Sequence, residues 1–408
     1  MKKMLAYKTK KNKDMRQILI ATDFFPKIGG AHYWLYQVYK YWPEQVVAYV
    51  QDYVNDMALA DLQVEFDKED HGPLELRRLD LSLRGGSLLQ PKNFLRVLKI
   101  GRCLSKCSSS DICLHVLRTI FDSYYAVFAK FLAPTRTKLI LYAHGEEFFV
   151  AKTSREFRFL TKMALKKADL IIANSHFTKR QVREFFSKAQ VEVIHLGVNY
   201  KDFQIPLSKA LAYRHKWGFH ENDVILLTLA RMESRKNHAR VLRGLEKLIR
   251  EGLSVGYVII GTGEEEEHLK TLVRELRIGD KVRFLGRVSE EEKYLAFNAA
   301  DIYVMPSIQH GSMIEGFGIV FLEAAAAGIP SIAGNVGGQP EAVLHGKTGL
   351  VVDGTDEKEL REALQYLILN PEVRKKMGKI GREWAKQHDW KNISQKIYEA
   401  VSGVCFRA

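Results

Sequence analysis

The sequence predicts an α/β protein built from two doubly wound, Rossmann-like domains that face each other across a cleft. The first observation is the opening pattern, in which the apolar strand Gln17–Thr22 and the glycine loop Gly29-Gly30 precede a helical pattern. The second is that buried strands and helical patterns keep alternating along the chain. The third is a reset around Gly197–Pro206, after which a second, similar series begins. Such sheets bind ligands at the carboxyl ends of their strands, so we expect a ligand between the two domains.

Each element is placed by its hydrophobic periodicity. The further strands of the first domain are Leu139–Tyr142, Leu170–Ala173 and Val191–His195, and its helices are Ala31–Tyr41, Lys92–Lys106, Ser154–Lys167 and Lys179–Lys188. The strands of the second domain are Val224–Ala230, Val255–Ile260, Val282–Leu285, Ile302–Met305 and Ile329–Ala333, and its helices are Ala239–Glu251 and Glu264–Leu276. The end of the chain, Pro371–Val401, is helical. We place the domains at residues 1–200 and 201–385.

The composition is that of a globular protein with an uneven charge. Of the 408 residues, 46% are hydrophobic and 27% are charged, which supports two cores. Residues 1–200 contain 32 Lys and Arg against 20 Asp and Glu, a net charge of +12, which leaves +2 for the rest. This asymmetry predicts an anionic partner for the first domain: a lipid surface, a nucleic acid or an acidic substrate. For the basic tail Met1–Arg16, a disordered, solvated start is an equal alternative.

Cysteine usage and hydropathy indicate a cytoplasmic protein. The cysteines have neither zinc-site nor redox-motif spacing and are expected as reduced thiols: Cys103, Cys107, Cys113 and Cys405. The start of the chain is charged, unlike a signal peptide, and no run reaches the roughly 18–20 apolar residues of a spanning helix. We expect the protein in the cytoplasm, either free or peripherally bound to the inner face of the membrane.

Two carboxylates, Glu315 and Glu323, bracket a glycine-rich turn that leads into the helix-forming run Ala324–Ala327. Helical geometry between them would set them roughly 12 Å apart, with the N-terminal amides of the helix in between. Such amides bind anions. An anion with a carboxylate toward each end suggests a diphosphate flanked by two polyols, which is the form of a nucleotide-sugar. The alternative is a solvated helix start with a favourable acidic residue.

Basic residues and glycines at other strand ends supply what a diphosphate needs. Arg231 and Lys236 follow the first strand of the second domain; Arg grips a diphosphate through two N–H groups, and Lys adds a point charge. Gly29 and Gly30 let a backbone approach a phosphate or sugar closely. His144 follows a strand and is placed to contact a sugar hydroxyl or an anion. A solvated basic turn, an ordinary turn and a structural histidine are the respective alternatives.

Several motifs are absent from the sequence. Without an Asp-x-Asp motif, the chain has no obvious means of holding a divalent metal against a diphosphate, so we expect neither a metal nor a cofactor. Without a Walker P-loop, ATP hydrolysis is not expected, and without a Gly-x-Ser-x-Gly elbow an acyl nucleophile is not expected.

The helical segment Lys92–Lys106 combines a basic face with an apolar one. Helical spacing gathers five basic side chains within about one third of the circumference. They are Lys92, Arg96, Lys99, Arg102 and Lys106, and the opposite side carries Phe94, Val97, Leu98, Ile100 and Leu104. Such a helix can lie on an anionic bilayer. The favoured alternative is that its apolar face covers the sheet.

Several motifs in a fixed order carry a family resemblance over nearly the whole chain. They are Gly29-Gly30, His144-Gly145, Ala173-Asn-Ser-His176, His195-Leu-Gly-Val-Asn199, Arg231 with Lys236, Gly261-Thr-Gly263, and Glu315 with Glu323. Together they resemble the retaining family-four glycosyltransferases of the GT-B fold, and Gly316–Ala324 resembles the mannosyl-transferring members. Asn237 stands where such members commonly carry glycine.

The resemblance implies roles for the candidate residues. Arg231 and Lys236 would bind the diphosphate, and the backbone of Gly30, beside Gly29, would approach the donor closely. Glu315 would contact the transferred sugar, and His144 would lie near the anomeric centre. The resemblance also assigns sugar and phosphates to the amides of Phe317, Gly318 and Ile319, the ribose to Glu323, and the base to Arg287 and Val288. It implies metal-independent transfer with retention, and a C-terminal helix, over residues 386–408, that packs back on the first domain.

The function expected from this resemblance is hexose transfer from a nucleotide-sugar, with GDP-mannose favoured over UDP-sugars, to a glycan or lipid-linked acceptor of polysaccharide biosynthesis. The acceptor should bind the basic first domain, and no nucleic acid is expected as a partner. Two alternatives stay open. One is a nucleotide-sugar epimerase of the same architecture, and the other is a non-catalytic sugar-nucleotide-binding protein.

Overall fold

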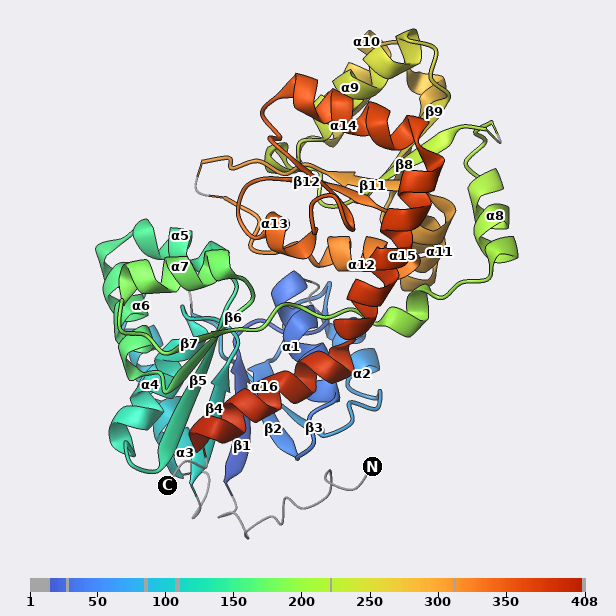
Figure 1. Ribbon diagram of the computed structural model, residues 1–408. Helices are drawn as coiled ribbons and strands as arrows, with labels where there is room; N and C mark the ends of the chain where they lie inside the picture. The colour runs from blue at the N-terminus through green and yellow to red at the C-terminus, as the bar shows by residue number, and fades with distance from the viewer. Residues whose placement is uncertain are drawn as a thin grey trace, which may run out of the picture. The chain divides into compact units, whose positions relative to one another are not determined.

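The computed structural model describes residues 15–26, 29–83, 87–106, 111–220, 222–311 and 313–405. The chain forms two compact units, drawn in Figure 1. Unit 1 consists of the chain up to Asn174, of Lys179–Ile194 and of the residues from Ser394 onward, and unit 2 consists of Ser175–Thr178 and His195–Ile393. The basic tail lies outside the described residues except for Met15 and Arg16.

Within the described part of unit 1, seven parallel strands form one sheet in the order β3-β2-β1-β4-β5-β6-β7. They are β1 (Arg16–Ala21), β2 (Val46–Gln51), β3 (Leu74–Leu79), β4 (Ile112–Val116), β5 (Thr137–Ala143), β6 (Leu170–Ala173) and β7 (Val191–Val193). The central strands of a parallel sheet that is covered on both faces are buried, and every residue of β4 is buried. The strand order reverses between β1 and β4, so the loops after these two strands diverge at the edge where such sheets bind ligands.

Helices cover this sheet. They are α1 (Gly30–Lys40), α2 (Ala60–Phe66), α3 (Pro91–Lys106), α4 (Asp122–Leu132), α5 (Glu146–Lys152), α6 (Arg155–Lys167) and α7 (His176–Phe185). The predicted start of α6, Ser154, is the N-cap of the helix: its hydroxyl accepts a hydrogen bond from the amide of Phe157 and caps the first turn.

The C-terminal helix α16 (Trp390–Cys405) packs on α1 through its residues from Ser394 onward, and Figure 1 shows this red helix beside α1. The hydroxyl of Ser394 donates to the carbonyl of Val38 at 2.7 Å, and the hydroxyl of Tyr398 donates to the carboxylate of Glu44 at 2.6 Å. The predicted return of the chain's end to the first domain is therefore confirmed.

The described cysteines are free thiols, as predicted. The sulfur atoms of Cys113 in β4 and Cys405 in α16 lie 3.2 Å apart and are buried, whereas Cys103 is exposed. Cys107 lies outside the described residues.

Within the described part of unit 2, six parallel strands form a sheet in the order β10-β9-β8-β11-β12-β13. They are β8 (Val224–Leu229), β9 (Val255–Ile260), β10 (Val282–Gly286), β11 (Ile302–Met305), β12 (Ser331–Gly334) and β13 (Gly349–Val352). The α-helices are α8 (Leu207–His215), α9 (His238–Arg250), α10 (Glu266–Glu275), α11 (Glu290–Ala299), α12 (Ile319–Ala327), α13 (Gln339–Ala342), α14 (Glu357–Leu369) and α15 (Pro371–Gln387). Short 3₁₀ helices are η1 (Tyr200–Phe203), η2 (Ser234–Lys236) and η3 (Gly279–Lys281). The two doubly wound parallel sheets confirm the predicted fold class.

One helix prediction was wrong at its start, for a reason that lies far away in the sequence. The helix expected at Lys179–Lys188 is α7, which begins three residues earlier because the carboxylate of Glu341 accepts hydrogen bonds from its first amides. The segment Pro371–Val401 is helical, as predicted, and consists of two helices, α15 and α16, with a break between them. At this break Val198 pairs with the backbone on both sides, donating to the carbonyl of His388 and accepting from the amide of Trp390.

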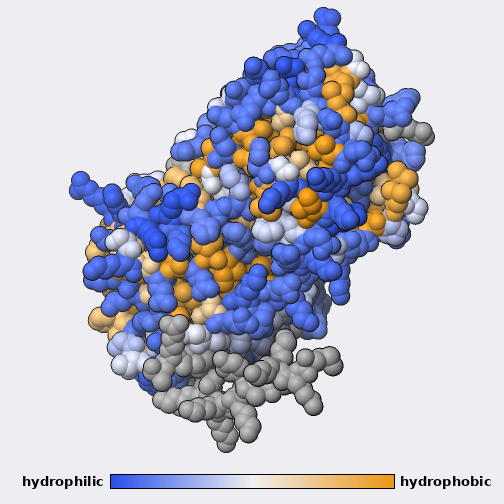
Figure 2. Space-filling view, in the orientation of Figure 1, coloured by the Kyte–Doolittle hydropathy of each residue, from blue (hydrophilic) through white to orange (hydrophobic). Residues whose placement is uncertain are grey.

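None of the helices in the described residues is long and apolar enough to cross a membrane. Helix α3 buries Val97 and Leu104, as expected for a helix that covers the sheet, whereas Phe94 is 49% exposed and Leu95 is 62% exposed. The prediction that Phe94 belongs to the buried apolar side was therefore wrong. Figure 2 shows that hydrophilic residues cover most of the visible face of the protein.

Candidate active site

The charged candidates of unit 2 come from loops at the point where its strand order reverses. The reversal lies between β8 and β11. Arg231 and Lys236 follow β8, and Glu315 lies in the long loop between β11 and α12. The carboxyl ends of parallel strands share one edge of the sheet, so these loops meet there.

Glu315 forms an ion-paired cluster with two cations of the β8 loop. Its Oε2 accepts a hydrogen bond from Nη1 of Arg235 at 2.9 Å and another from Nζ of Lys236. Burial alone would raise the pKa of Glu315, but the charges and hydrogen bonds of Lys236 and Arg235 outweigh it and lower that pKa to about 2. Glu315 is therefore an ionised carboxylate, and Lys236, predicted to face a diphosphate, has Glu315 as its partner here.

Arg235 is the residue of this cluster that the sequence prediction missed. Glu233 orients it by accepting from its Nε at 2.8 Å, and the same Glu233 lies 2.8 Å from Nη1 of Arg231. The side chain of Arg231 is 77% exposed, whereas that of Arg235 is 16% exposed. The loop thus offers one outward cation and two inward ones. The signal available in the sequence was that Arg235 directly precedes Lys236.

Asn237 explains how the β8 loop turns back into α9. Its φ is 67° and its backbone is left-handed, a conformation in which glycine and asparagine are the favoured residues. Its side-chain amide donates to the carbonyls of Pro306 and Gly354 at 3.1 and 2.7 Å. Asparagine therefore supplies the backbone shape of the glycine common in the family, and adds two hydrogen bonds that hold the loop.

The loop 315–318 is shaped by a second glycine turn. The amide of Gly338 donates to the carbonyl of Glu315 at 2.9 Å. A Cβ atom at Gly337 would overlap the carbonyl oxygen of Glu315, and one at Gly338 would overlap that of Gly316. The two backbones are thus in direct contact, which explains why Gly337 and Gly338 stand at this turn.

The start of α12 differs from the expectation of a helix spanning both glutamates. The helix begins at Ile319, after Gly318, whose φ of 91° and closeness to the ring of Phe321 exclude a larger residue. Glu315 therefore lies in the loop before the helix, and the spacing of roughly 12 Å calculated for helical geometry does not apply. The amide of Phe321 donates to the carbonyl of Gly318 at 3.1 Å, whereas the amides of Ile319 and Val320 come before the first hydrogen bond that helical geometry allows. Phe317 itself is buried.

Glu323 lies inside α12 and is buried. Its Oε1 accepts from Nζ of Lys293 at 3.1 Å, and Lys293 also contacts the exposed Glu290 at 2.7 Å. Arg287 and Val288 follow β10 directly after Gly286, whose φ is 64°. The predicted ribose and base contacts remain predictions.

Gly29 and Gly30 in unit 1 have different surroundings. Gly29 precedes α1, and a Cβ atom there would approach Nδ1 of His32 to 2.9 Å. A Cβ atom at Gly30 would have no atom within 4 Å among the described residues. Packing among the described residues of unit 1 therefore accounts for the glycine at 29 and not for the one at 30.

His144 is held in one tautomer by its surroundings in unit 1. Its Nε2 donates to the carbonyl of Leu117 at 2.7 Å, and its ring packs edge-on against Trp34 at 4.8 Å. Burial lowers the pKa of His144 to about 3, so its imidazole is neutral. Glu147 accepts the amides of His144 and Gly145, each at 2.8 Å, and fixes this turn.

A further charged group of unit 1, not predicted from the sequence, lies where its strand order reverses. Arg118 follows β4 and donates to the hydroxyl of Thr22 after β1 at 2.8 Å. It pairs with the buried Asp122 at 3.4 Å and with Asp23 at 3.5 Å. This group places polar side chains at the ligand edge of the unit 1 sheet.

Two family models match the chain in succession. "Glycosyltransferase Family 4" matches residues 46–202, and "Glycosyl transferases group 1" matches residues 210–384. The first model falls mainly on unit 1 and the second on unit 2.

Curated relatives and solved structures agree with these models. The chain is 32% identical, over 64% of its length and 69% of the relative's, to a GDP-mannose-dependent monoacylated alpha-(1-6)-phosphatidylinositol monomannoside mannosyltransferase of Corynebacterium glutamicum. It is 32% identical to a GDP-mannose-dependent alpha-(1-6)-phosphatidylinositol monomannoside mannosyltransferase of Mycolicibacterium smegmatis, and there the match covers 58% of this chain and 63% of the relative. In fold it is similar to Anabaena HepE in complex with UDP, with a TM-score of 0.77 and 20% identity over 95% of this chain and 100% of that one. The chain belongs to the family-four glycosyltransferases of the GT-B fold.

Proposed function

We propose that this chain is a retaining, metal-independent glycosyltransferase that moves a hexose from a nucleotide-diphosphate sugar, with GDP-mannose favoured, to a glycan or lipid-linked acceptor on the cytoplasmic side of a membrane. The observation that carries the proposal is the cluster of Glu315, Arg235 and Lys236 in unit 2. The mannose donor is supported by the relatives of Mycolicibacterium smegmatis and Corynebacterium glutamicum, which are GDP-mannose-dependent mannosyltransferases.

The cluster provides charge for a leaving diphosphate. Arg235 and Lys236 carry two positive charges, of which Glu315 neutralises one. A diphosphate competes with Glu315 for both cations, with Arg231 available as an outward third. The first-turn amides of α12 add positive partial charge. Glu315, released in part from its cations, then accepts hydrogen bonds from hydroxyls of the transferred sugar.

The titration properties of the candidates favour the leaving phosphate as the base. Glu315 has a pKa of about 2 and His144 a pKa of about 3, so neither takes up a proton near neutral pH. In the proposed step the bond from the anomeric carbon to the phosphate oxygen breaks, and a bond to the acceptor oxygen forms on the same face of the sugar. The acceptor hydroxyl's proton passes to the departing phosphate oxygen. Positive charge from Arg235 and Lys236 replaces a metal in this step.

A donor panel followed by product analysis tests this function. GDP-mannose, UDP-glucose and UDP-N-acetylglucosamine are first compared by thermal shift, and the stabilising donor is then incubated with a polyprenyl-diphosphate-linked sugar, in the presence and absence of EDTA. We expect a glycosylated lipid whose new linkage has the anomeric configuration of the donor, with EDTA having no effect. An isomerised nucleotide-sugar formed without acceptor would favour the epimerase, and donor binding without turnover would favour a binding protein; either result contradicts transfer.

The lipid-linked acceptor is supported by the surface of α3. Lys92, Lys99 and Arg102 are exposed, Phe94 and Leu95 of the same helix are exposed as well, and residues 1–200 carry a net charge of +12. Basic and apolar side chains on one helix surface suit an anionic bilayer.

Liposome sedimentation tests this contact. We expect the protein to prefer vesicles that contain anionic lipid, and the variant Lys99→Glu with Arg102→Glu to lose the preference. The matched control reverses two exposed charges of α15 in unit 2, Lys376→Glu with Lys379→Glu, and should retain the preference. Equal binding to neutral and anionic vesicles, or equal loss in both variants, would contradict a membrane contact through α3.

A further inference from the structure

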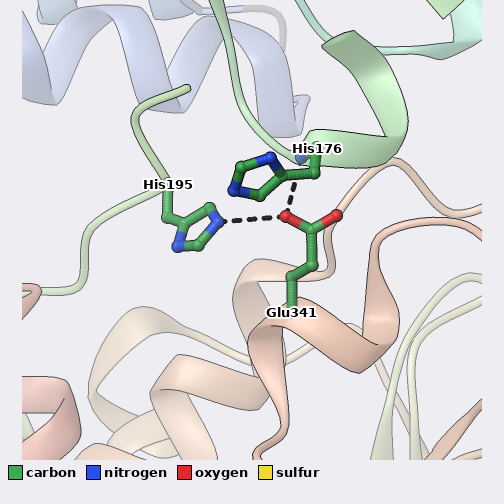
Figure 3. A group of neighbouring side chains, drawn as sticks. All are labelled: His176, His195 and Glu341. Atoms are coloured by element: carbon green, nitrogen blue, oxygen red, sulfur yellow. Dashed lines mark hydrogen bonds and ion pairs between the residues drawn. The ribbon is translucent and has the colours of Figure 1, made fainter. Parts of the chain in front are cut away.

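Two imidazoles and a carboxylate converge within unit 2, apart from the groups already assigned to the donor. His176 is the first residue of α7, His195 follows β7, and Glu341 lies on α13. One ligand atom from each of the three lies within 4.8 Å of the others. Figure 3 shows both rings beside the same carboxylate. Three ligating groups from three different segments, gathered in one place, have the composition of a metal site.

The chemistry of the three groups selects among metal ions. Magnesium and calcium prefer oxygen ligands throughout, whereas imidazole nitrogens suit zinc and its neighbours in the first transition row. Two histidines and one carboxylate are also the protein ligands of several zinc sites in which water takes the fourth position. His176 is exposed, so solvent reaches the fourth position here.

The spacing of the ligands matches a tetrahedral ion after one side-chain movement. Ligand atoms about 2.0–2.1 Å from a tetrahedral zinc ion lie about 3.3 Å apart. Nε2 of His195 and Oε2 of Glu341 are already 3.1 Å apart. The ligand atom of His176 lies within 4.8 Å of the other two, and the side chain of this exposed residue can rotate to bring it closer. A metal ion would bind Nε2 of His195 in place of its proton. The imidazole would then be the neutral tautomer that carries its proton on Nδ1.

Two of the three ligands are held in place by neighbouring groups. Oε2 of Glu341 accepts the amide of His176 at 2.7 Å, and Oε1 accepts the amide of Phe177 at 2.9 Å. The ring of His195 stacks on Phe317, with centroids 5.1 Å apart and an angle of 28° between the planes. Outer contacts of this kind orient metal ligands and raise metal affinity.

We propose that His176, His195 and Glu341 form a binding site for a divalent transition metal, with zinc as the expected ion. The site borders the loop 315–318, because His195 stacks on Phe317 and the hydroxyl of Ser175 donates to the carbonyl of Gly316 at 2.8 Å. A bound ion holds His195 against this loop. The role of this ion is therefore structural, and the ion takes no part in the proposed transfer step.

Direct metal titration of the purified, chelator-treated full chain, without donor, tests the site. Zinc is titrated against a chromophoric chelator, and cobalt is followed by its visible absorption bands. We expect one ion per chain, no sulfur-to-cobalt charge-transfer band, and a rise in the melting temperature with zinc. His176→Ala should weaken zinc binding at least about tenfold and remove the zinc-dependent rise.

The variant also separates a metal site from a purely structural one. In the structure the backbone amide of His176 makes the hydrogen bond to Glu341, and alanine retains that amide, so the melting temperature without metal should not change. The control is His268→Ala, which removes an exposed histidine paired with Glu265 at 3.1 Å and should leave zinc binding intact. Absence of one-to-one zinc binding, or equal zinc affinity in wild type and His176→Ala, would overturn the proposal. Since no donor is present, that failure leaves the proposed transfer untouched.

Discussion

Lys236 and Glu315, 79 residues apart in the sequence, form a hydrogen-bonded ion pair in which the lysine is 10% and the glutamate 15% exposed. A mostly buried cation that is ion-paired with one carboxylate is suited to change partners when a ligand with more negative charge arrives. The same pair keeps Glu315 ionised, because the charge of Lys236 outweighs the effect of burial on the carboxylate's pKa.

Replacing Lys236 should act on the chemical step. In Lys236→Ala the leaving diphosphate loses a preplaced charge, and we expect kcat to fall about 10²- to 10³-fold at saturating donor. The control Lys247→Ala removes an exposed cation of the same unit, paired with Glu357 at 3.5 Å, and should leave kcat unchanged. Wild-type turnover in the first variant would contradict the assignment of Lys236 to the diphosphate.

Replacing Glu323 should act on donor binding. If its carboxylate holds the ribose, Glu323→Ala should raise the donor Kd by about tenfold, measured by calorimetry. Glu290→Ala is the matched control, because Glu290 contacts the same Lys293 but is 67% exposed. An equal loss of affinity in both variants would mean that Lys293, and not the ribose contact, is responsible.

Adding one methyl group at Gly338 should disturb the loop that carries Glu315. A Cβ atom at Gly338 would overlap the carbonyl oxygen of Gly316, so the two backbones must separate. We expect Gly338→Ala to lose about 1–3 kcal/mol of stability and to bind donor more weakly, measured by thermal unfolding with and without donor. Gly279→Ala, with no atom near the added group among the described residues, should match the wild type.

Replacing Gly30 tests whether a ligand lies against the backbone of unit 1 at this residue. Gly30→Ala has room for its methyl group among the described residues, so the melting temperature should stay the same. Transfer activity should fall if a phosphate or sugar approaches this backbone, and steady-state kinetics measure it. Gly403→Ala, also in a helix of unit 1 with room for the methyl group, should keep both properties. Full activity in Gly30→Ala would remove Gly30 from the site.

Glu147 should make stability depend on pH in a defined window. Burial raises its pKa from 4.5 to about 7, despite the lowering effect of its backbone hydrogen bonds. Between these values the folded chain binds more protons at this site than the unfolded chain, so stability falls as pH rises from 4.5 to 7. Relative to Glu147→Gln, the free energy of unfolding of the wild type should fall by up to roughly 3 kcal/mol across this pH window. Chemical denaturation at several pH values measures this difference. Glu146→Gln, at an exposed neighbour, should run parallel to the wild type.

The sequence predicted best where local signals decide the outcome. Strands β6, β9 and β11 have the predicted bounds because each is a continuous apolar run. Three strands of unit 1, β2, β3 and β4, were not predicted. The exposed residues of β3 and the single histidine inside β4 interrupt their apolar patterns.

The site was predictable in its residue types but less so in their pairing. Glu315, Lys236 and the glycine turns stand out by position, whereas Arg235 becomes significant only through its contacts with Glu233 and Glu315. The start of α7 depends on Glu341, 165 residues from His176, and no local pattern carries that information. Contacts over such separations are set by the tertiary fold, which explains why local patterns leave them open.

The contact between the 315–318 backbone and the turn at Gly337 and Gly338 has a consequence for protein engineering. A graft that replaces only the loop 315–318 with that of another family member, to change the transferred sugar, would leave the new loop against the original turn at Gly337 and Gly338. The two segments would then no longer match in shape. Chimeras that exchange both segments together should fold and bind donor, and those that exchange the first alone should not.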